Sequence, residues 1–312
     1  MNTSILITGG AGFIGANLAR AALADGRVGR VVVMDDLSMT NSGGLDDVDV
    51  ELHESSILDE TALKSALKGI DAVVHLAAIP SVPRSIANPM ATHQANATGT
   101  LALLEGCRSA GVNHVVCSSS SSVYGSNPAL PKSEREWVRP MSPYAVSKLA
   151  TEQYLLAYQS SFGLSTLPFR FFNVYGPGQT PGHAYAAAVP TFIDALLRES
   201  PVLVNGDGSQ SRDFTFVGSV CEILIEAAVN TVSSPEPVNL AFGARTDLMT
   251  LIDTLEEVTG KTARVEHRAP RPGDVPHSEA DNSSLRDLFP DLQPVGLQEG
   301  LHHTVDWFRS RY

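Results

Sequence analysis

The 312-residue sequence predicts an α/β protein, with a doubly wound parallel sheet followed by a smaller α/β lobe at the C-terminal end. Up to Arg170, short runs of branched apolar residues alternate with amphipathic segments in units of about 20–30 residues, as in successive βαβ units. Beyond Arg170, aromatic residues and turn formers replace that pattern. The chain also exceeds the roughly 250–300 residues at which one core usually stops growing, so two lobes are expected.

The first unit joins a strand, a glycine turn and a helix. Ile5–Thr8 is a short apolar strand, and the run Gly9-Gly10-Ala11-Gly12-Phe13-Ile14-Gly15 precedes an amphipathic stretch that extends through Leu23. The three spaced glycines would permit, in order, a tight turn, the close approach of a pyrophosphate and the packing of helix on strand. The amides at the start of the helix would then face phosphate oxygens, so this unit predicts a dinucleotide site.

A carboxylate at the end of the second strand indicates which dinucleotide is bound. The run Arg30–Met34 ends in Asp35, twenty residues beyond Gly15. An acid at this position accepts hydrogen bonds from the ribose diol of adenosine and repels a 2′-phosphate. Because no arginine occurs in 36–41, we expect NAD rather than NADP as the cofactor.

The remaining elements continue the alternation. In the first part we expect strands at 48–52, 72–76, 112–117 and 164–169, and helices at 61–67, 92–110 and 143–162. In the second part we expect helices at 189–197, 219–229, 248–258 and 297–309, a strand at 202–204, and irregular proline-rich chain at 268–281. We therefore assign residues 1–172 to a first domain, onto which 214–232 packs back, and residues 173–312 to a second.

A serine run and the helix after it carry the candidate catalytic residues. The strand at 112–117 leads into Ser118–Ser122, and ligands sit at the carboxyl ends of strands in open α/β sheets. Tyr144 and Lys148 are four residues apart, which places them on one face of the expected helix. A nearby ammonium lowers the pKa of a phenol towards neutral pH, and the Ser120 hydroxyl can relay a proton. Tyr144, Lys148 and Ser120 therefore form a candidate acid–base set.

The composition disfavours several classes of binding partner and indicates the cellular compartment. The formal net charge of -12 disfavours binding to nucleic acid or to an anionic membrane surface. Three cysteines without a C-x-x-C pattern fit a reduced compartment better than a disulfide framework or a metal site. The sequence begins without a basic leader, and no apolar run approaches about 18 residues. We expect a cytoplasmic protein that needs no metal.

Seven stretches, in order along the chain, resemble one family. They read T-G-G-A-G-F-I-G, H-L-A-A, N-x-x-G-T, S-S-S-S-S-V-Y-G, S-P-Y-A-V-S-K, R-F-F-N-V-Y-G-P-G and S-R-D-F. Together they resemble the extended short-chain dehydrogenase/reductase family, and within it the nucleotide-sugar epimerases and dehydratases. The resemblance spans essentially the whole chain. It implies a Rossmann domain that holds NAD and a smaller substrate lobe that closes over a nucleoside-diphosphate sugar.

The resemblance also assigns residues to the two ligands. The positions that match cofactor-binding residues are Gly9, Gly12, Phe13, Ile14, Gly15, Asp35, Asp36, Leu37, Ser38, Ile57, Leu76, Ala77, Ala78, Asn96, Ser118, Tyr144, Lys148 and Phe171. The positions that match substrate-binding residues are Ser81, Val82, Arg84, Ser120, Ser121, Ser122, Tyr144, Asn173, Ala188, Val189, Val204, Asn205, Arg212, Arg271, Asp274 and Ser278. Arg212 and Arg271 suit a diphosphate, because a guanidinium pairs two phosphate oxygens at once. One departure is Ser56, which replaces an acid that meets the adenine amine in the family.

The serine run favours one reaction within the family. Hexose 4,6-dehydratases carry an Asp-Glu pair just before V-Y-G, whereas this chain has Ser121 and Ser122, which cannot supply the acid and base of an elimination. The resemblance then implies a 4-epimerase, in which Tyr144 removes the 4-OH proton, a 4-keto sugar forms and turns, and hydride returns to its other face. The alternatives are a dehydratase, a decarboxylase or an oxidoreductase of the same family, or a catalytically idle NAD-sensing regulator.

The resemblance also indicates the sugar. Ser278 stands where family members carry either a bulky tyrosine or a small residue, and a small side chain leaves room for a 2-N-acetyl group. The run Ser81–Ser85 is similar to that of epimerases that act on N-acetylhexosamines. We expect UDP-GlcNAc and UDP-GalNAc as substrates, with UDP-Glc and UDP-Gal accepted as well. A homodimer through the helices at 92–110 and 142–162 is expected from family likeness.

Overall fold

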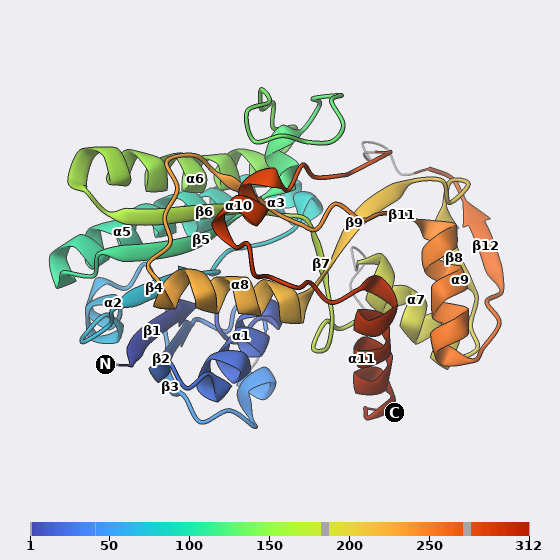
Figure 1. The fold of residues 1–312 in the computed structure, drawn as a ribbon, viewed down its shortest axis with the longest axis horizontal. Helices are drawn as coiled ribbons and strands as arrows, with labels where there is room; N and C mark the ends of the chain where they lie inside the picture. The colour runs from blue at the N-terminus through green and yellow to red at the C-terminus, as the bar shows by residue number, and fades with distance from the viewer. Residues whose placement is uncertain (1, 41, 182–186, 271–275, 312) are drawn as a thin grey trace.

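A seven-stranded sheet, in which every pair of neighbouring strands is parallel, forms the centre of the larger lobe (Figure 1). The computed structural model describes residues 2–40, 42–181, 187–270 and 276–311. Across the sheet the strands are β10 (Val238–Leu240), β6 (Ser165–Phe171), β5 (His114–Ser120), β4 (Ala72–His75), β1 (Thr3–Thr8), β2 (Val28–Asp35) and β3 (Glu51–Glu54). The predicted parallel sheet is confirmed.

Helices cover both faces of this sheet (Figure 1). One face carries α1 (Phe13–Ala24) and α8 (Val217–Val229), and the other carries α2 (Glu60–Ala66), α5 (Gly99–Ala110) and α6 (Pro143–Phe162). On β1, Ile5 and Ile7 pack into the core with α1 and α8, whereas Leu6 packs into the core with α2, α5 and α6. Because all three side chains are buried, the strand is apolar on both faces, which is why it reads as a continuous apolar run.

The helix predicted at 92–110 is longer and interrupted. It begins as α4 (Pro89–His93), passes through a π-helical segment (Gln94–Thr98) and continues as α5. The π-helical segment contains Asn96, whose Oδ1 accepts a hydrogen bond from Ile79 N at 2.7 Å and whose Nδ2 donates to Ser147 Oγ at 2.9 Å. Asn96 therefore joins the loop after β4 to α6. Single π-helical turns of this kind are common at functional sites.

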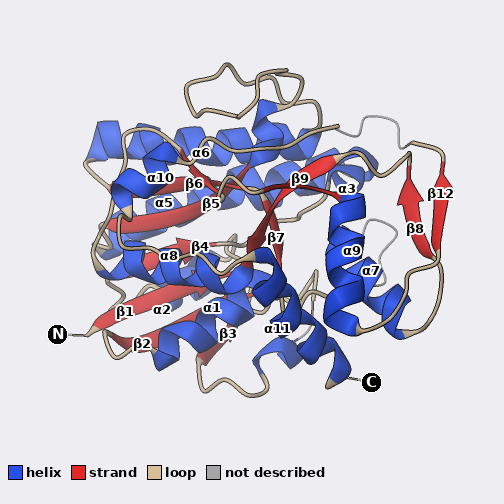
Figure 2. Ribbon diagram, turned by 45° about the vertical axis from the view of Figure 1, so that its right-hand side comes forward, coloured by secondary structure: helices blue, strands red, loops and turns tan. Residues whose placement is uncertain are grey.

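Among its described residues, the smaller lobe contains two short sheets and the helices α7 (Ala188–Leu197), α9 (Leu248–Thr259) and α11 (Leu297–Arg309) (Figure 2). The strands are β7 (Asn173–Tyr175), β9 (Ser211–Phe216) and β11 (Arg245–Asp247) in one sheet, and β8 (Val202–Asn205) and β12 (Val265–Arg268) in the other. Gly260 ends α9 with a φ of 71°, the left-handed conformation expected after a helix C-terminus.

Several short elements differ from the predictions. The strand predicted at 48–52 lies at Glu51–Glu54, because Val48 and Val50 pack against the core from a turn. Five strands (β7, β9, β10, β11 and β12) and the helices α3 (Val82–Ala87) and α10 (Ser283–Leu288) were absent from the predicted elements; six residues or fewer show little periodicity. Strand β10 lies in the range assigned to the second domain, yet it pairs with β6, so the sheet of the first lobe includes residues 238–240.

Helix α6 carries polar residues on a face that it buries. Ser142 caps its first turn, because the Ser142 Oγ accepts a hydrogen bond from Ala145 N at 3.1 Å, and Gly163 ends it with a φ of 72°. Lys148 and Glu152 lie on the buried face.

In the part of the chain that the structure describes, neither this helix nor any other is long and apolar enough to cross a membrane.

Candidate functional site

Most of the predicted site residues lie at or just after the carboxyl ends of the central strands. Gly9 follows β1, Asp35 ends β2, Leu76 follows β4, and Ser120 and Phe171 end β5 and β6. The strand order changes direction beside β1, where β2 lies on one side and β4 on the other. Open α/β sheets bind ligands in the crevice at such a switch point.

The glycine turn between β1 and α1 is shaped by close approaches. Gly9 has a φ of 71°, and a Cβ there would lie 2.6 Å from Ala77 N. A Cβ on Gly15 would lie 2.4 Å from Gly9 O, so this glycine lets the helix pack on the turn. At Gly12, the N-cap of α1, a Cβ would meet one described atom within 4 Å, Gly9 O at 3.3 Å. The open side of Gly12, at a helix N-terminus, fits a pyrophosphate.

Asp35 is held in place by backbone amides. Its Oδ2 accepts a hydrogen bond from Ala11 N at 3.0 Å, and its Oδ1 accepts one from Leu37 N at 2.9 Å. Burial raises the pKa of this carboxyl above its ordinary value, although the amide hydrogen bonds oppose that shift. Each carboxylate oxygen keeps acceptor capacity for a ribose hydroxyl. The following turn contains Asp36, whose Oδ1 accepts from Ser38 N at 3.0 Å.

The three candidate catalytic side chains meet at the end of β5. Lys148 Nζ donates to Ser118 O at 2.7 Å and contacts Ser118 Oγ at 3.3 Å. The Ser120 side chain interacts with the Tyr144 hydroxyl in the direction that lowers the pKa of this phenol. Ser120 Oγ also accepts from Ser122 N at 3.2 Å, which fixes the first turn after the strand. Two serines of β5, separated by one residue, thus interact with the two residues that α6 places one turn apart.

The predicted direction of the Tyr144 pKa shift is wrong for the polypeptide itself. Burial raises the pKa of the Tyr144 phenol, and the hydrogen bond with Ser120 opposes that rise. Burial also lowers the pKa of the Lys148 ammonium, which is bound to Ser118 O. Desolvation disfavours both charged forms, so the ammonium does not produce the net lowering that its spacing from Tyr144 predicted.

Glu152 and Arg170 form a buried pair that the sequence analysis missed. Arg170 Nε donates to Glu152 Oε2 at 2.9 Å, and Arg170 Nη2 donates to Glu152 Oε1 at 2.7 Å. The Arg170 side chain is 4% exposed and the Glu152 side chain is 0% exposed. Ser119 Oγ donates to Glu152 Oε2 at 3.0 Å. The spacing of Tyr144, Lys148 and Glu152, four residues each, is the signal that could have placed the glutamate on the same helix face.

Other predicted cofactor residues lie near the same edge of the sheet. Leu76 N donates to Thr8 O at 3.0 Å, which extends the pairing of β4 with β1 into the loop that carries Ala77 and Ala78. Ile57 is buried and packs beside Gly99, at the start of α5. Phe13 and Ile14 begin α1 and are partly buried against the core.

Two serines predicted to contact substrate have unused polar atoms. Among the described residues, Ser81 Oγ and Ser122 Oγ are buried without a hydrogen-bond partner. Ser81 also has a φ of 90°, a strained value for a residue with a side chain. Ser121 and Ser122 begin the short turn after β5, and Val82 and Arg84 lie in α3. Buried unpaired hydroxyls in the segments after β4 and β5 fit a polar ligand such as a sugar.

The smaller lobe presents the remaining substrate candidates. Arg212 Nη1 donates to Ser211 O at 2.9 Å and to Pro276 O at 3.1 Å, and Ser278 N donates to Ser211 O at 3.0 Å. Asn173 begins β7, and its Nδ2 donates to the backbone of the neighbouring strand β9. Ala188 and Val189 begin α7, Val204 and Asn205 end β8, and Arg271 and Asp274 lie outside the described residues.

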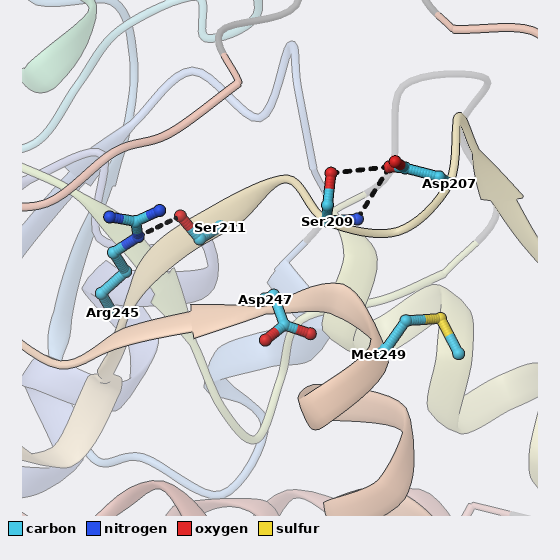
Figure 3. Close-up of a pocket in the computed structure, with 6 residues that line it drawn as sticks. All are labelled: Asp207, Ser209, Ser211, Arg245, Asp247 and Met249. Carbon is cyan, nitrogen blue, oxygen red and sulfur yellow. Dashed lines mark hydrogen bonds between the residues drawn. The ribbon is translucent and has the colours of Figure 1, made fainter.

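A pocket of about 430 Å³ opens on the smaller lobe, away from the serine strand (Figure 3). It contains none of the predicted site residues. Asp207 Oδ1 accepts from Ser209 N and Oγ, and Arg245 Nε donates to Ser211 Oγ at 2.8 Å (Figure 3). Asp247 caps α9 by accepting from Thr250 N at 2.8 Å. Because these charged side chains are already paired, the carboxyl ends of the central strands remain the candidate active site.

The chain is similar to known proteins over its whole length. The model of the NAD dependent epimerase/dehydratase family matches residues 5–241. The UDP-glucose 4-epimerase of Mycolicibacterium smegmatis is 37% identical over 98% of each chain. The UDP-N-acetylglucosamine 4-epimerase from Methanobrevibacter ruminantium, solved with UDP-N-acetylmuramic acid, is 34% identical with a TM-score of 0.93, over 100% of this chain and 99% of that one. The Thermus thermophilus UDP-glucose 4-epimerase, solved with NAD, is 34% identical with a TM-score of 0.89, over 99% of this chain and 100% of that one.

Proposed function

The chain belongs to the NAD-dependent epimerase/dehydratase family, and we propose that it is a UDP-sugar 4-epimerase that works through a 4-keto intermediate. The observation that carries the proposal is the pairing of Tyr144 with Ser120 and of Lys148 with Ser118 at the end of β5. This pairing lies at the same sheet edge as the open glycine turn. The relatives named above, similar over their whole length, are UDP-sugar 4-epimerases.

The cofactor would lie along the edge formed by β1, β2 and β4. The Gly12 side of the turn suits its pyrophosphate, and Asp35 suits the adenosine ribose. When bound there, NAD supplies a hydride acceptor, and then a hydride donor, for C4 of the sugar. Asn96 accepts a hydrogen bond from Ile79 N and so holds the loop after β4 in place. It would therefore affect the cofactor indirectly, through the position of that loop.

Side chains of the protein would transfer the proton of the sugar 4-OH. Tyr144 takes the proton of the sugar 4-OH as the carbonyl forms and returns it when the carbonyl is reduced. Ser120, whose side chain lowers the pKa of Tyr144, can contact the same sugar oxygen. Since burial raises the pKa of Tyr144, we expect turnover to increase with pH until the phenolate predominates.

The short turn after β5 supports epimerisation over elimination. Ser121 and Ser122 occupy the first positions of that turn, where the family's dehydratases place two carboxyl groups. A serine hydroxyl does not ionise near neutral pH, so it cannot serve as the acid or base that removes water. An idle NAD-sensing regulator is disfavoured because Tyr144 and Lys148 are both present and both directed to the serine strand.

The sugar that we propose is an N-acetylhexosamine, with glucose and galactose accepted as well. Ser278 lies on the segment that contacts β9, and its amide donates to Ser211 O. Arg212, the candidate diphosphate ligand, reaches the same segment through Pro276 O. A small hydroxymethyl side chain at Ser278 would leave room for a 2-N-acetyl group while the keto sugar turns, and remote binding of UDP would keep it in the site.

Proton NMR of the purified protein with UDP-GlcNAc tests this function. A 4-epimerase produces the galacto isomer, visible in the anomeric and H4 signals. The Tyr144→Phe variant should keep bound NAD and lose activity by roughly 10²–10⁴-fold, because an acid–base group is removed. Tyr154→Phe, on the same helix, is the matched control and should stay near wild-type activity. A new alkene or released carbon dioxide would instead indicate one of the related enzymes, and no turnover would favour the regulator.

We also propose a homodimer through α5 and α6. Val146 on α6 is 51% exposed, and Met90 on the adjoining α4 is 74% exposed. Large apolar side chains exposed on adjoining helices favour a protein contact. Light scattering that returned the mass of a single chain would exclude the dimer.

A further inference from the structure

Glu152 occupies an unusual place for a buried carboxylate. It lies on α6 one turn beyond Lys148 and two turns beyond Tyr144, and its side chain is 0% exposed. Arg170, on β6, donates two hydrogen bonds to it at 2.9 and 2.7 Å. An ion pair in a core is not by itself a stabilising feature, because desolvation offsets the attraction. The contacts around the pair therefore decide what it does.

The carboxylate receives a third hydrogen bond from the serine strand. Ser119 Oγ donates to Glu152 Oε2 at 3.0 Å. In sequence, Ser119 lies between Ser118, which binds Lys148, and Ser120, which binds Tyr144. Glu152 is thus joined to the one serine between the two that hold the proposed catalytic side chains, and the same helix carries both of those side chains.

The arginine connects this contact to the substrate side of the molecule. The Arg170 guanidinium lies over the Tyr124 ring, 4.7 Å from its centre. Tyr124 OH donates to Asn239 Oδ1 at 2.7 Å, and Asn239 Nδ2 donates to Asp281 O at 3.0 Å. Asp281 ends the segment that carries Ser278. A continuous set of contacts therefore runs from α6 to the segment proposed to adjoin the sugar.

We propose that Glu152 and Arg170 are positioning residues for the epimerisation, which hold α6 at the register where Lys148 and Tyr144 meet the serines of β5. The inference rests on the proposed function. Glu152 and Arg170 touch neither ligand, and they act through Ser119 and through the helix. Three titratable groups face this region from the strands: His75 on β4, Cys117 on β5 and Arg170 on β6.

Ser119→Ala tests the inference because it leaves the ion pair intact. Loss of this one hydrogen bond to a charged group should lower kcat roughly tenfold, with KM changed less than about twofold. It should also raise the pKa of the Tyr144 phenol, because the Ser120 contact that opposes its rise is weakened. Ultraviolet difference titration against Tyr144→Phe measures that pKa without any turnover.

Thr166→Val is the matched control. Thr166 lies on β6, is buried, and donates to Leu155 O at 3.3 Å on the same helix α6, beyond the catalytic end. It should leave both kcat and the Tyr144 pKa unchanged. If Ser119→Ala behaves like Thr166→Val, or lowers only the resistance to urea, the inference is overturned. If the wild-type protein does not epimerise, the proposed function fails, and the titration alone still decides whether Ser119 positions Tyr144.

Discussion

At the residue scale, burial decides which groups near the site carry charge. His75 has a pKa lowered to about 3 by burial, and its ring nitrogens contact Thr8 Oγ1 at 2.7 Å and Thr100 Oγ1 at 3.1 Å. It is therefore a neutral residue that joins β1, β4 and α5. Tyr144 and Lys148 experience the same desolvation, yet each keeps a hydrogen bond to a serine of β5. Those two bonds distinguish the candidate catalytic groups from a buried histidine with a structural role.

Asp213 is a carboxyl whose pKa is clearly raised by burial. Its Oδ2 accepts from Gly243 N at 3.0 Å and from Ala280 N at 3.4 Å, and its Oδ1 has no partner among the described residues. Desolvation raises the pKa of the carboxyl from 3.8 to about 6, although the amide hydrogen bonds oppose it. Asp213 joins β9 to the loops near 243 and 280, so its titration affects how the smaller lobe is held together.

The folded state binds the Asp213 proton more tightly than the unfolded state. The stability that this proton contributes is therefore lost as the pH rises from about 4 to 6. A rise in pKa from 3.8 to about 6 corresponds to about 3 kcal/mol. Relative to Asp213→Asn, the wild-type free energy of unfolding should fall by up to that amount between pH 4 and pH 7. Urea denaturation of both proteins measures the difference. A difference that does not vary with pH would contradict the assignment.

At the element scale, the start of α6 places the proposed catalytic tyrosine. Ser142 is the N-cap, Pro143 is the first helical residue, and Tyr144 follows in the first turn. The Ser142 Oγ accepts from Ala145 N at 3.1 Å and so satisfies one amide that the helix leaves unpaired. The same contact limits fraying of the turn that carries Tyr144.

Ser142→Ala should therefore reduce both stability and activity. The lost cap costs about 1 kcal/mol of unfolding free energy, and a frayed first turn moves Tyr144 away from Ser120, so kcat should fall as well. Asp59→Ala is the control, because Asp59 caps α2 by accepting from Thr61 N and Ala62 N at 3.0 Å, at a distance from Tyr144. It should lose similar stability with no change in kcat. Equal kcat in the two variants would show that the cap of α6 is purely structural.

The elements that the sequence could predict are those with strong local signals. Helix α11 lies at the predicted residues, 297–309, because its apolar residues recur at helical spacing and no proline interrupts them. Strand β1 follows from a branched apolar run with a glycine turn after it. Strand β10 has three residues and is defined by its pairing with β6, a contact distant in sequence, so no local pattern indicates it.

At the scale of the whole molecule, the candidate site could be predicted in part. The order of the stretches along the chain was enough to expect Tyr144 beside Ser120, because parallel strands bring their carboxyl ends to one edge. The pair of Glu152 with Arg170 depends on the register of β5 with β6, where Ser119 lies opposite Arg170. Such a register is a tertiary property, and the apolar pattern of buried strands does not encode it. The direction of the Tyr144 pKa shift likewise depends on burial, which residue spacing does not measure.

Asn17 joins the two lobes beside the start of α1. Asn17, on α1, donates to Phe13 O at 2.8 Å within its own helix and to Pro177 O at 2.8 Å in the loop after β7. The same loop continues to Gly178, where a Cβ would lie 3.3 Å from Asn17 Nδ2. A loop of the second lobe is thus held against the helix whose first turn is proposed to bind the pyrophosphate.

Asn17→Ala should accelerate the loss of bound NAD. The substitution removes the hydrogen bond that holds the loop after β7 against α1, beside the proposed cofactor site. One hydrogen bond contributes about 0.5–1.5 kcal/mol, so we expect NAD release to be roughly threefold to tenfold faster. The NAD that remains with the protein after timed gel filtration measures the rate. Asn230→Ala is the control: Asn230 is exposed at the end of α8, its amide contacts Glu226, and its removal should leave release unchanged. Equal release from both variants would mean that the loop after β7 does not retain the cofactor, and that NAD is held by the first lobe alone.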